Sequence, residues 1–403
     1  ASGTEMPRIG IGVPAHLGRA SVAALDLLRN VGPQLLICEY SENQAKEDLA
    51  ACQELAEALN AELMVEIVAP CERALDMEMK DAADAIAAAG VKPDSVIVAQ
   101  SRLMDFTLET LEAMGVPSFE ETHAAARKAF PGVALGGGVL TNFTEMNRNH
   151  PTPDLFDFIS HLTSAVVHEV DDRSVMETLQ SLPSIIGSVR AMAGGKPYRV
   201  GPSAIGMRYN PYGPSTHDNK NNARMAFNQQ DPRHRALSGA AFTLGYVARM
   251  AAGGVEAVSL GTAVGELGLA YRKMDHAQPW YDEAKAEEEG WVFPLYHIVA
   301  AMSGATGAEV INVESSAPDK VLALSYKSAT GQLLWLANLT PEPERVSVSG
   351  LPAGEALIGR LDEEIFVPAV PRPADFAADS GPSGDTAAFE LGPYAVVRIE
   401  LAT

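Results

Sequence analysis

The residues best suited to proton transfer follow a run of three glycines, residues 136–138, at the end of a short apolar segment. Asn142, Glu145 and Asn147 come next in the chain. Glycines let a backbone approach a ligand closely. A carboxylate beside such a run can transfer protons, and asparagine amides can hydrogen-bond sugar hydroxyls. We therefore expect Glu145 to be catalytic and to lie outside any packed core, with Asn142 and Asn147 binding substrate.

A second group of reactive side chains follows the next apolar segment. His168 precedes two carboxylates, Asp171 and Asp172. A histidine near a carboxylate suits a general base with an orienting partner. We expect His168 to be catalytic and Asp171 to line the site, and we favour Asp172 as the N-cap of the helix that follows. The spacing lacks H-x-H and H-E-x-x-H, so we expect no metal ion.

The longest connection, residues 205–235, carries the expected binding side chains Arg208, Asn210 and Asp231. Long connections in compact domains commonly form lids or binding walls. Arg208 lies nearest the preceding apolar run, where a guanidinium could bind a carboxylate or a carbonyl oxygen. We assign all three residues to substrate binding.

Four further residues stand at or near the ends of other apolar segments. His16 follows the first segment, Glu39 ends the second, and Glu66 lies within the third. Each would line a pocket if its side chain points inward at the carboxyl end of a strand, and we assign all three to substrate binding. Glu266 is the first carboxylate after the eighth segment, and we expect it to be the second catalytic carboxylate.

The elements that position these residues follow one repeating pattern. Eight short apolar runs, most of them about 25–40 residues apart, are each followed by a helical stretch. Such alternation predicts parallel strands joined by crossover helices, and eight units close a (β/α)8 TIM barrel with its chemistry at the carboxyl ends of the strands. The expected strands are Arg8–Pro14, Gln34–Tyr40, Glu62–Val68, Asp94–Gln100, Gly132–Gly138, Leu155–His161, Tyr198–Ala204 and Glu256–Leu260.

The pattern changes after the eighth unit. From Glu309 onward, short alternating runs such as 321–326 and 394–401 are separated by Gly and Pro turns. This alternation is typical of antiparallel sheet. We therefore expect a TIM-barrel domain at residues 7–304 and a C-terminal antiparallel β-sandwich domain at residues 305–403, with an internal loop at residues 368–385.

The segment from Gly10 to Ala15 fits the G-x-G-x-x-A fingerprint of dinucleotide-binding folds. Its glycines, however, fall inside the apolar run, and Pro14 lacks an N–H that a pyrophosphate would need. We interpret Gly10 and Gly12 as residues that permit tight packing inside the barrel, and we expect no cofactor.

The composition restricts the partners. The formal net charge of -22 argues against nucleic acid and anionic membrane surfaces, which need a basic face. The sequence has no run of 18 apolar residues, and its first residues, ASGTEMPR, do not resemble a signal peptide. The three cysteines lack the spacing of metal ligands and fit a reducing compartment. We expect a cytoplasmic protein without nucleic-acid or membrane partners.

Several segments, in order along the chain, resemble the D-apionate lactonases, a family of sugar-lactone hydrolases related in architecture to glycoside hydrolases. They are GGGVLTNFTEMNRNHP (136–151), DFISHLTSAVVHEVDDRSVMETL (157–179), VRAMAGGKPYRVGP (189–202), DPRHRALSGAAFTLGYVARMAAGGVEAVSL (231–260), FPLYHIVAAMSGATGAEV (293–310) and GPYAVVRIEL (392–401). The resemblance implies that the family's motif positions are Glu145, Asn147, His168, Asp171, Asp172, Arg208, Asn210 and Asp231.

Two departures from that family pattern stand out. Such barrels tend to carry a Tyr-Tyr-Glu-Thr type sequence after strand eight, whereas this chain has SLGTA (259–263) and no carboxylate before Glu266. From this sequence we also expect the N-terminal β domain of longer relatives to be absent.

Three functions fit these residues, each with a small carbohydrate or sugar lactone as partner. The first is hydrolysis of a sugar-acid lactone, with His168 or Glu145 as general base and Arg208 or Asn142 at the oxyanion. The second is glycoside hydrolysis, with Glu145 as acid and Glu39, Glu66 or Glu266 as second carboxylate. The Asn-Glu pair common after strand four of barrel glycosidases is missing from AQSRLMDF (99–106). The third is a catalytically degenerate carbohydrate-binding barrel.

Overall fold

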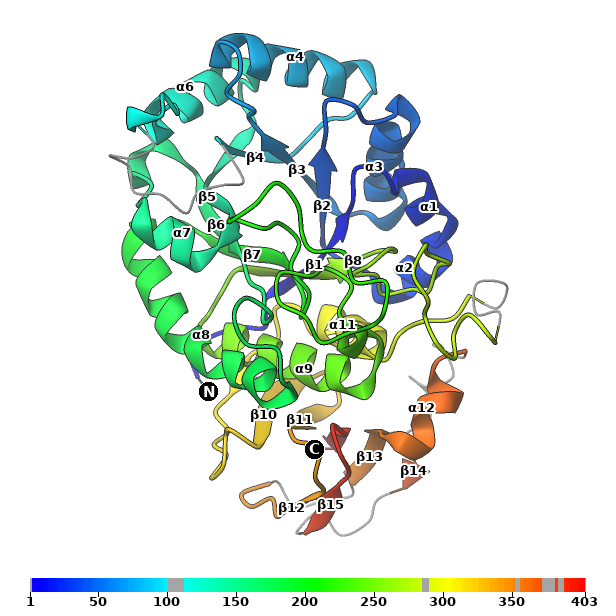
Figure 1. The fold of residues 1–403 in the computed structure, drawn as a ribbon. Helices are drawn as coiled ribbons and strands as arrows, with labels where there is room; N and C mark the ends of the chain where they lie inside the picture. Colours follow the sequence, from blue (N-terminus) through cyan, green and yellow to red (C-terminus); the bar gives the residue numbers. More distant parts are fainter. Residues whose placement is uncertain are drawn as a thin grey trace.

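A closed barrel of eight parallel strands forms the larger part of the computed structural model, and an antiparallel sheet lies beside it (Figure 1). The structure describes residues 2–100, 112–284, 290–351, 356–371, 381–382 and 388–402. Parallel pairing of the first and last strands, with Arg8 opposite Ala257, closes the barrel. The predicted (β/α)8 barrel is confirmed. Its strands are β1 (Arg8–Val13), β2 (Leu35–Tyr40), β3 (Glu62–Val68), β4 (Ser95–Ala99), β5 (Ala134–Asn142), β6 (Phe158–Leu162), β7 (Tyr198–Ser203) and β8 (Ala257–Thr262).

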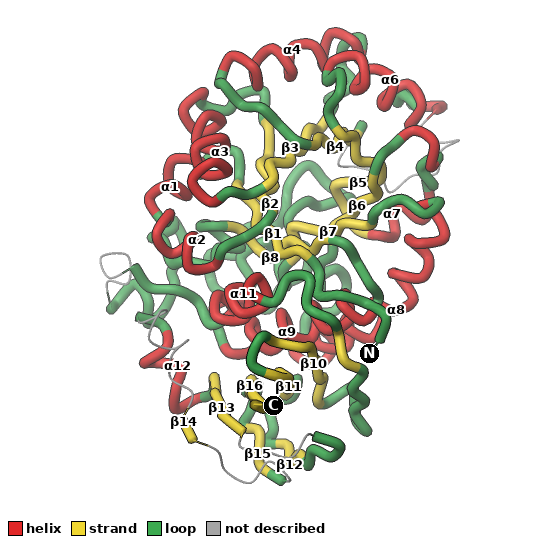
Figure 2. The backbone as a smooth tube through the Cα atoms, turned by 180° about the vertical axis from the view of Figure 1, so that it is seen from behind, coloured by secondary structure: helices red, strands yellow, loops and turns green. Residues whose placement is uncertain are grey.

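Helices surround the barrel (Figure 2). In α3, Leu49, Cys52 and Leu55 recur at helical spacing and are buried against the strands. The described helices of this part are α1 (Gly18–Ala23), α2 (Leu25–Val31), α3 (Lys46–Leu59), α4 (Leu75–Ala88), α6 (Phe119–Ala129), α7 (Phe143–Arg148), α8 (Asp172–Ala193), α9 (Leu237–Ala252) and α11 (Leu295–Gly304), with 3-10 turns η1 (Pro153–Leu155) and η2 (Pro232–Arg235).

The barrel interior follows the period of two expected of strands. Ile37, Met64 and Phe158 belong to an inner apolar cluster, whereas Cys38 and Val65 belong to the cluster between strands and helices.

Two glycines of β1 pack tightly inside the barrel. A Cβ at Gly10 would lie 2.2 Å from the Ser259 hydroxyl oxygen, and one at Gly12 would lie 2.8 Å from Pro202. The packing interpretation of these glycines is therefore confirmed.

A ring of charges fills the amino end of the barrel. Arg8 and Arg199 both bind Glu62, at 2.6 and 2.8 Å, and both also bind Glu256. These four side chains therefore neutralise one another's charges at this end of the barrel. Any chemistry is then expected at the opposite, carboxyl end, as in other barrels of this type.

The C-terminal part is a β-sandwich, as predicted. Its six-stranded sheet has the order β14-β13-β16-β11-β10-β9, and β12 pairs with β15. One face of the six-stranded sheet carries Leu322 and Trp335 and belongs to the same hydrophobic core as α9. The other face carries Leu334 and Ile399 and packs against Leu391 of β15. The strands are β9 (Val310–Ile311), β10 (Val321–Ser328), β11 (Gly331–Asn338), β12 (Glu344–Val346), β13 (Ala356–Leu361), β14 (Gly381–Pro382), β15 (Phe389–Leu391) and β16 (Val396–Ala402).

The domain limits of 7–304 and 305–403 remain our proposed division; α11 ends at Gly304 and β9 begins at Val310. One sequence prediction needs correction here. The loop expected at 368–385 begins inside the helix α12 (Glu363–Ala369), which Asp362 caps by accepting hydrogen bonds from the backbone of Glu364 and Ile365. Most of that predicted loop lies outside the described residues.

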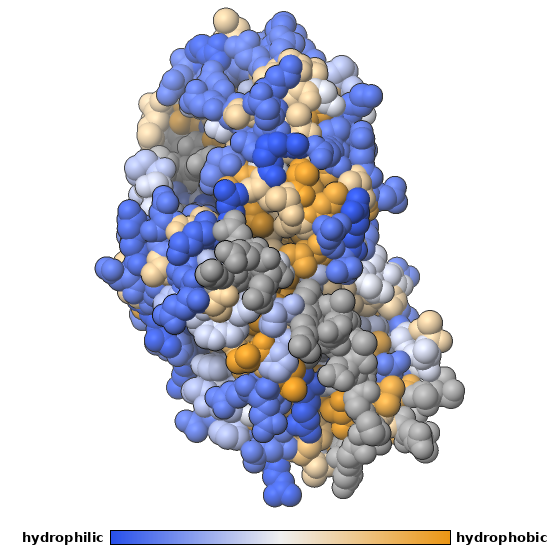
Figure 3. All heavy atoms as spheres, turned by 90° about the vertical axis from the view of Figure 1, so that its right-hand side faces the viewer, coloured by the Kyte–Doolittle hydropathy of each residue, from blue (hydrophilic) through white to orange (hydrophobic). Residues whose placement is uncertain are grey.

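The face shown in Figure 3 is mainly hydrophilic and is interrupted by hydrophobic patches near its middle. Acidic side chains are abundant in the sequence, in keeping with its net charge of -22. Among the helices that the structure describes, none combines the length and the apolar character needed to cross a bilayer.

Candidate active site

Two glutamates lie side by side where β2 and β3 approach the carboxyl end of the barrel. Glu39 and Glu66 are direct partners in the parallel ladder. Each lies two residues after an inward residue, Ile37 or Met64, and therefore points into the barrel. Glu66 is 1% exposed, whereas Glu39 is half-buried. The alternation of the strands thus brings together two carboxylates that are far apart in sequence.

Arg208 enters the barrel from the connection after β7. Its Nη1 lies 2.5 Å from Glu66 Oε2, and its side chain is 7% exposed. The ring of Tyr209 lies 4.8 Å from the guanidinium carbon. Burial by itself would lower the pKa of Arg208, but its interaction with Glu66, and less strongly with Tyr209 and Glu39, raises the pKa above the ordinary value. Arg208 is therefore a fixed cation beside Glu39.

Glu145 lies elsewhere than the sequence suggested. It is the third residue of α7 and is fully buried, so the expectation that it lies outside any packed core was wrong. Its Oε2 accepts a hydrogen bond of 3.0 Å from the Asn142 backbone N–H, which is the geometry of a capping box. Tyr212 donates its hydroxyl to Oε1 at 3.4 Å. Burial raises the pKa of Glu145, although these hydrogen bonds and the charge of Arg148 oppose the shift.

Four aromatic side chains gather at the rim, and we name them the rim cluster: His168, Tyr212, His217 and Phe227. Phe227 is central, with its ring centroid 6.1 Å from that of His168, 5.6 Å from Tyr212 and 5.5 Å from His217. Phe227 has a φ of 56°, a strained value for a bulky residue. The rim cluster joins the connections after β6 and β7, and Tyr212 links it to Glu145.

The predicted binding residues Asn210 and Asp231 have structural partners. Asn210 donates to the Ser215 carbonyl at 2.9 Å and accepts from the Tyr212 N–H at 2.9 Å. It therefore fixes the turn that presents Tyr212. Asp231 is fully buried and binds Arg233 through both carboxylate oxygens, at 2.7 and 2.8 Å. These contacts give both residues a structural role, and substrate binding by either residue stays a prediction.

The other predicted site residues differ in their exposure to solvent. His16, Asn147 and His168 are exposed, while Asn142 and Glu266 are half-buried. Asp171 is exposed and caps α8 by accepting from the Ser174 N–H at 3.0 Å. The preference for Asp172 as this cap was wrong, because Asp172 binds Arg224 and Arg233 instead.

Sequence reasoning missed two residues near the site. Tyr209 was not assigned a role, although it adjoins Arg208 in the chain and therefore had a usable signal. Phe227 had no usable sequence signal, because its unusual φ and its ring contacts appear only in three dimensions.

Within the described part of the chain, no group of three or more His, Cys, Asp or Glu side chains could hold a metal ion. Residues 101–106 of the strand-four segment lie outside the described residues.

Among solved structures, a family 30 glycoside hydrolase, an endoxylanase from Clostridium papyrosolvens, is similar with a TM-score of 0.56 and 8% identity over 99% of this chain and 97% of that one. A family 30 subfamily 8 xylanase from Clostridium acetobutylicum gives a TM-score of 0.56 and 10% identity over the same shares of the two chains. At such identities, the similarity shows the fold alone.

Sequence comparisons identify the family more specifically than the similarity of folds does. The profile of the D-apionate lactonase TIM barrel domain matches residues 9–307, and that of the D-apionate lactonase C-terminal immunoglobulin-like domain matches residues 318–399. A curated D-apionate lactonase from Brucella anthropi is 38% identical over 350 residues, which are 86% of this chain and 55% of that protein. The chain thus spans about half the length of this relative. Because the two profiles cover the barrel and most of the sheet domain, the chain belongs to the D-apionate lactonase family.

Proposed function

We propose that this chain hydrolyses the lactone of a sugar acid, with the lactone of D-apionate as the first substrate to test. The family assignment supports the reaction class. The observation that carries the proposal is the inward group of Glu39, Glu66 and Arg208 at the carboxyl end of the barrel. It offers a carboxylate that can accept a proton next to a fixed cation that can stabilise an oxyanion.

In the proposed reaction, Glu39 accepts a proton from a water molecule as that water attacks the ring carbonyl carbon. Arg208 stabilises the negative charge that develops on the carbonyl oxygen. Glu66 acts as a positioning residue, because its ion pair fixes the guanidinium. The bond between the carbonyl carbon and the ring oxygen then breaks, and the leaving oxygen takes a proton. The product is an open-chain hydroxy acid.

Glu145 is the proposed source of that last proton, which reaches the leaving oxygen through the Tyr212 hydroxyl, because the Glu145 side chain is itself fully buried. Burial raises the pKa of Glu145, which favours a protonated carboxyl over a wider pH range. The same rise in pKa makes Glu145 less suited to be the general base. His168, the other base considered from sequence, is exposed at the rim. These two observations support Glu39 as the base in place of the two bases considered from sequence. The rim cluster, with His168 and Tyr212, is the proposed contact surface for the sugar ring.

The test is Glu39→Gln, which keeps the shape of the side chain and removes its basicity. Hydrolysis of D-apionate lactone and a panel of aldonolactones is followed by acid release. We expect kcat to fall about 10²–10⁴-fold, the usual effect of losing a general base. Glu42→Gln is the matched control, because Glu42 is exposed on the connection after β2. Full activity in Glu39→Gln would refute this role for Glu39.

Glycoside hydrolysis is the second candidate, because Glu39 and Glu66 are paired on adjacent strands. Release of nitrophenol from nitrophenyl glycosides, without acid release from any lactone, would favour it. Sugar binding without turnover of either substrate class would favour a degenerate binding barrel. We also propose a reducing, cytoplasmic location, which is supported by the free cysteines Cys38, Cys52 and Cys71.

A further inference from the structure

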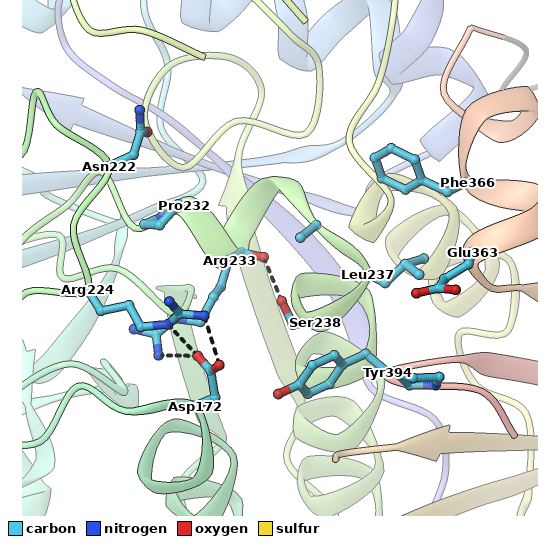
Figure 4. A pocket seen from close by; sticks show the side chains of 12 residues that line it. Asp172, Asn222, Arg224, Pro232, Arg233, Leu237, Ser238, Glu363, Phe366 and Tyr394 are labelled. Carbon is cyan, nitrogen blue, oxygen red and sulfur yellow. Dashed lines mark hydrogen bonds and ion pairs between the residues drawn. The ribbon is translucent and has the colours of Figure 1, made fainter. Parts of the chain in front are cut away.

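A cleft lies between the barrel connections and the C-terminal part (Figure 4). Its volume is about 580 Å³, within the range of small-molecule sites. The connection after β7 and the start of α9 form one wall. Helix α12 and Tyr394 form the other. Glu39, Glu66, Arg208 and Glu145 do not line this cleft, so its role is separate from the proposed reaction.

The barrel wall of the cleft carries a fixed polar network. Asp172 accepts from Arg224 Nε and Nη2 at 2.7 and 2.8 Å, and from Arg233 Nη1 at 3.2 Å. Arg233 is 5% exposed and is held from behind by Asp231. Arg224 is about half exposed. The network therefore presents both acceptors and donors in fixed positions.

The opposite wall is aromatic. Tyr394 and Phe366 project into the cleft, and the Tyr394 hydroxyl points toward Asp172 (Figure 4). That hydroxyl oxygen is buried and has no hydrogen-bond partner among the described residues. A buried hydroxyl without a partner is costly, so an acceptor on a bound molecule that reaches this hydroxyl would be stabilised by it. Burial, and to a lesser extent the charge of Asp172, raises the pKa of Tyr394, so the hydroxyl is a donor at neutral pH.

The charges of the cleft restrict the ligand. Two carboxylates, Asp172 and Glu363, face two guanidiniums, Arg224 and Arg233. A balanced set of this kind gives no net attraction to a strong anion or cation, but it can bind vicinal hydroxyl groups as acceptor and donor together. An aromatic wall opposite can pack against the C–H face of a sugar ring. We propose that this cleft is a second binding site for a neutral mono- or disaccharide.

The experiment measures sugar binding to the whole chain by saturation-transfer NMR and calorimetry. The neutral probes are D-apiose, D-xylose and cellobiose, with D-gluconate and N-methyl-D-glucamine as anionic and cationic polyols of similar size. We expect a neutral sugar to bind with a dissociation constant of about 1 mM, and both charged polyols to bind more weakly. Tighter binding of gluconate would replace the neutral-sugar proposal with an anion site.

Two variants locate the binding. Tyr394→Phe keeps the ring and removes the hydroxyl, so the dissociation constant should rise about 3- to 10-fold, as for one lost hydrogen bond. Phe366→Ala removes part of the aromatic wall and should abolish binding. Circular dichroism and thermal unfolding like those of the unmodified chain would show that both variants fold. Glu39→Gln is the control and should bind the sugar unchanged.

Three results would overturn the proposal. The first is that none of the neutral probes binds at tens of millimolar. The second is binding that survives both cleft variants. The third is binding that is lost in Glu39→Gln, which would place the sugar in the barrel mouth. None of these outcomes depends on whether the chain hydrolyses a lactone, so the two proposals can fail independently.

Discussion

Removing one member of the Glu66–Arg208 pair should have a large effect on stability and should separate structural from catalytic roles. The two side chains are 1% and 7% exposed, and their charged atoms lie 2.5 Å apart. Glu66→Gln leaves the guanidinium buried without its main counter-ion, which typically costs about 3–5 kcal/mol. Because Glu39 also interacts with Arg208, we expect the lower part of this range, about 3 kcal/mol.

The double variant Glu66→Met/Arg208→Met provides the decisive comparison. It removes both charges and keeps apolar volume, which is commonly close to neutral for stability. We expect it to recover most of the stability lost in Glu66→Gln while lactone hydrolysis remains abolished, since no cation then faces the oxyanion. Urea unfolding and acid release are the two assays. The exposed pair Asp26–Arg29 is the control, and Arg29→Met should cost less than about 1 kcal/mol.

Two outcomes would refute this reasoning. A cost below about 1 kcal/mol for Glu66→Gln would mean that the pair is not buried and closed as the geometry indicates. Hydrolysis at the unmodified rate by the folded double variant would remove Arg208 from the reaction. Arg208 would then have only the structural role of pairing with Glu66 inside the barrel.

Three further predictions concern other buried groups. Glu145→Gln should lower kcat about 10²–10⁴-fold if Glu145 supplies the last proton. The pKa of Glu145 is raised in the folded state, so this carboxyl contributes stability below the ordinary pKa of 4.5, and that contribution is lost as the pH rises above 4.5. The Glu145→Gln variant should lose this pH dependence, which urea unfolding at a series of pH values would measure. Burial lowers the pKa of His161, His234 and His297 to about 4. Each histidine should therefore contribute up to about 3 kcal/mol of stability above pH 6.5, and this contribution should be lost as the pH falls toward 4. A free energy of unfolding that stays constant over this pH range would contradict the prediction. Gly10→Ala should destabilise by at least about 2 kcal/mol, because its Cβ would lie 2.2 Å from the Ser259 hydroxyl, and Ser259→Gly should restore part of the loss in thermal unfolding.

The barrel and the sheet domain could be predicted because their signals are local. Eight apolar runs with helices between them need only short windows of sequence, and each predicted run overlaps an observed strand. The packing role of Gly10 followed from its place within a run and was confirmed. Helix α12 was not predicted, since its seven residues give too short a pattern and include Pro368.

The candidate site was only partly predictable. The sequence selected Glu39, Glu66 and Arg208 as separate binding residues because of their places near strand ends, but it could not show that Glu66 and Arg208 form an ion pair. It also assigned Glu145 to an exposed loop, whereas the short helix α7 buries it beneath Tyr212. The cleft between Tyr394 and Asp172 had no sequence signal, because one wall comes from the middle of the chain and the other from near its C-terminus.

What the sequence by itself determined about this protein is its set of elements and its family, since periodicity and motif order are properties of neighbouring residues. Only the tertiary structure decided which carboxylates are buried, which form ion pairs and which cap helices. The reason is that burial and ion pairing depend on distances between residues far apart in the chain. Those distances become fixed only when β1 and β8 pair and the barrel closes.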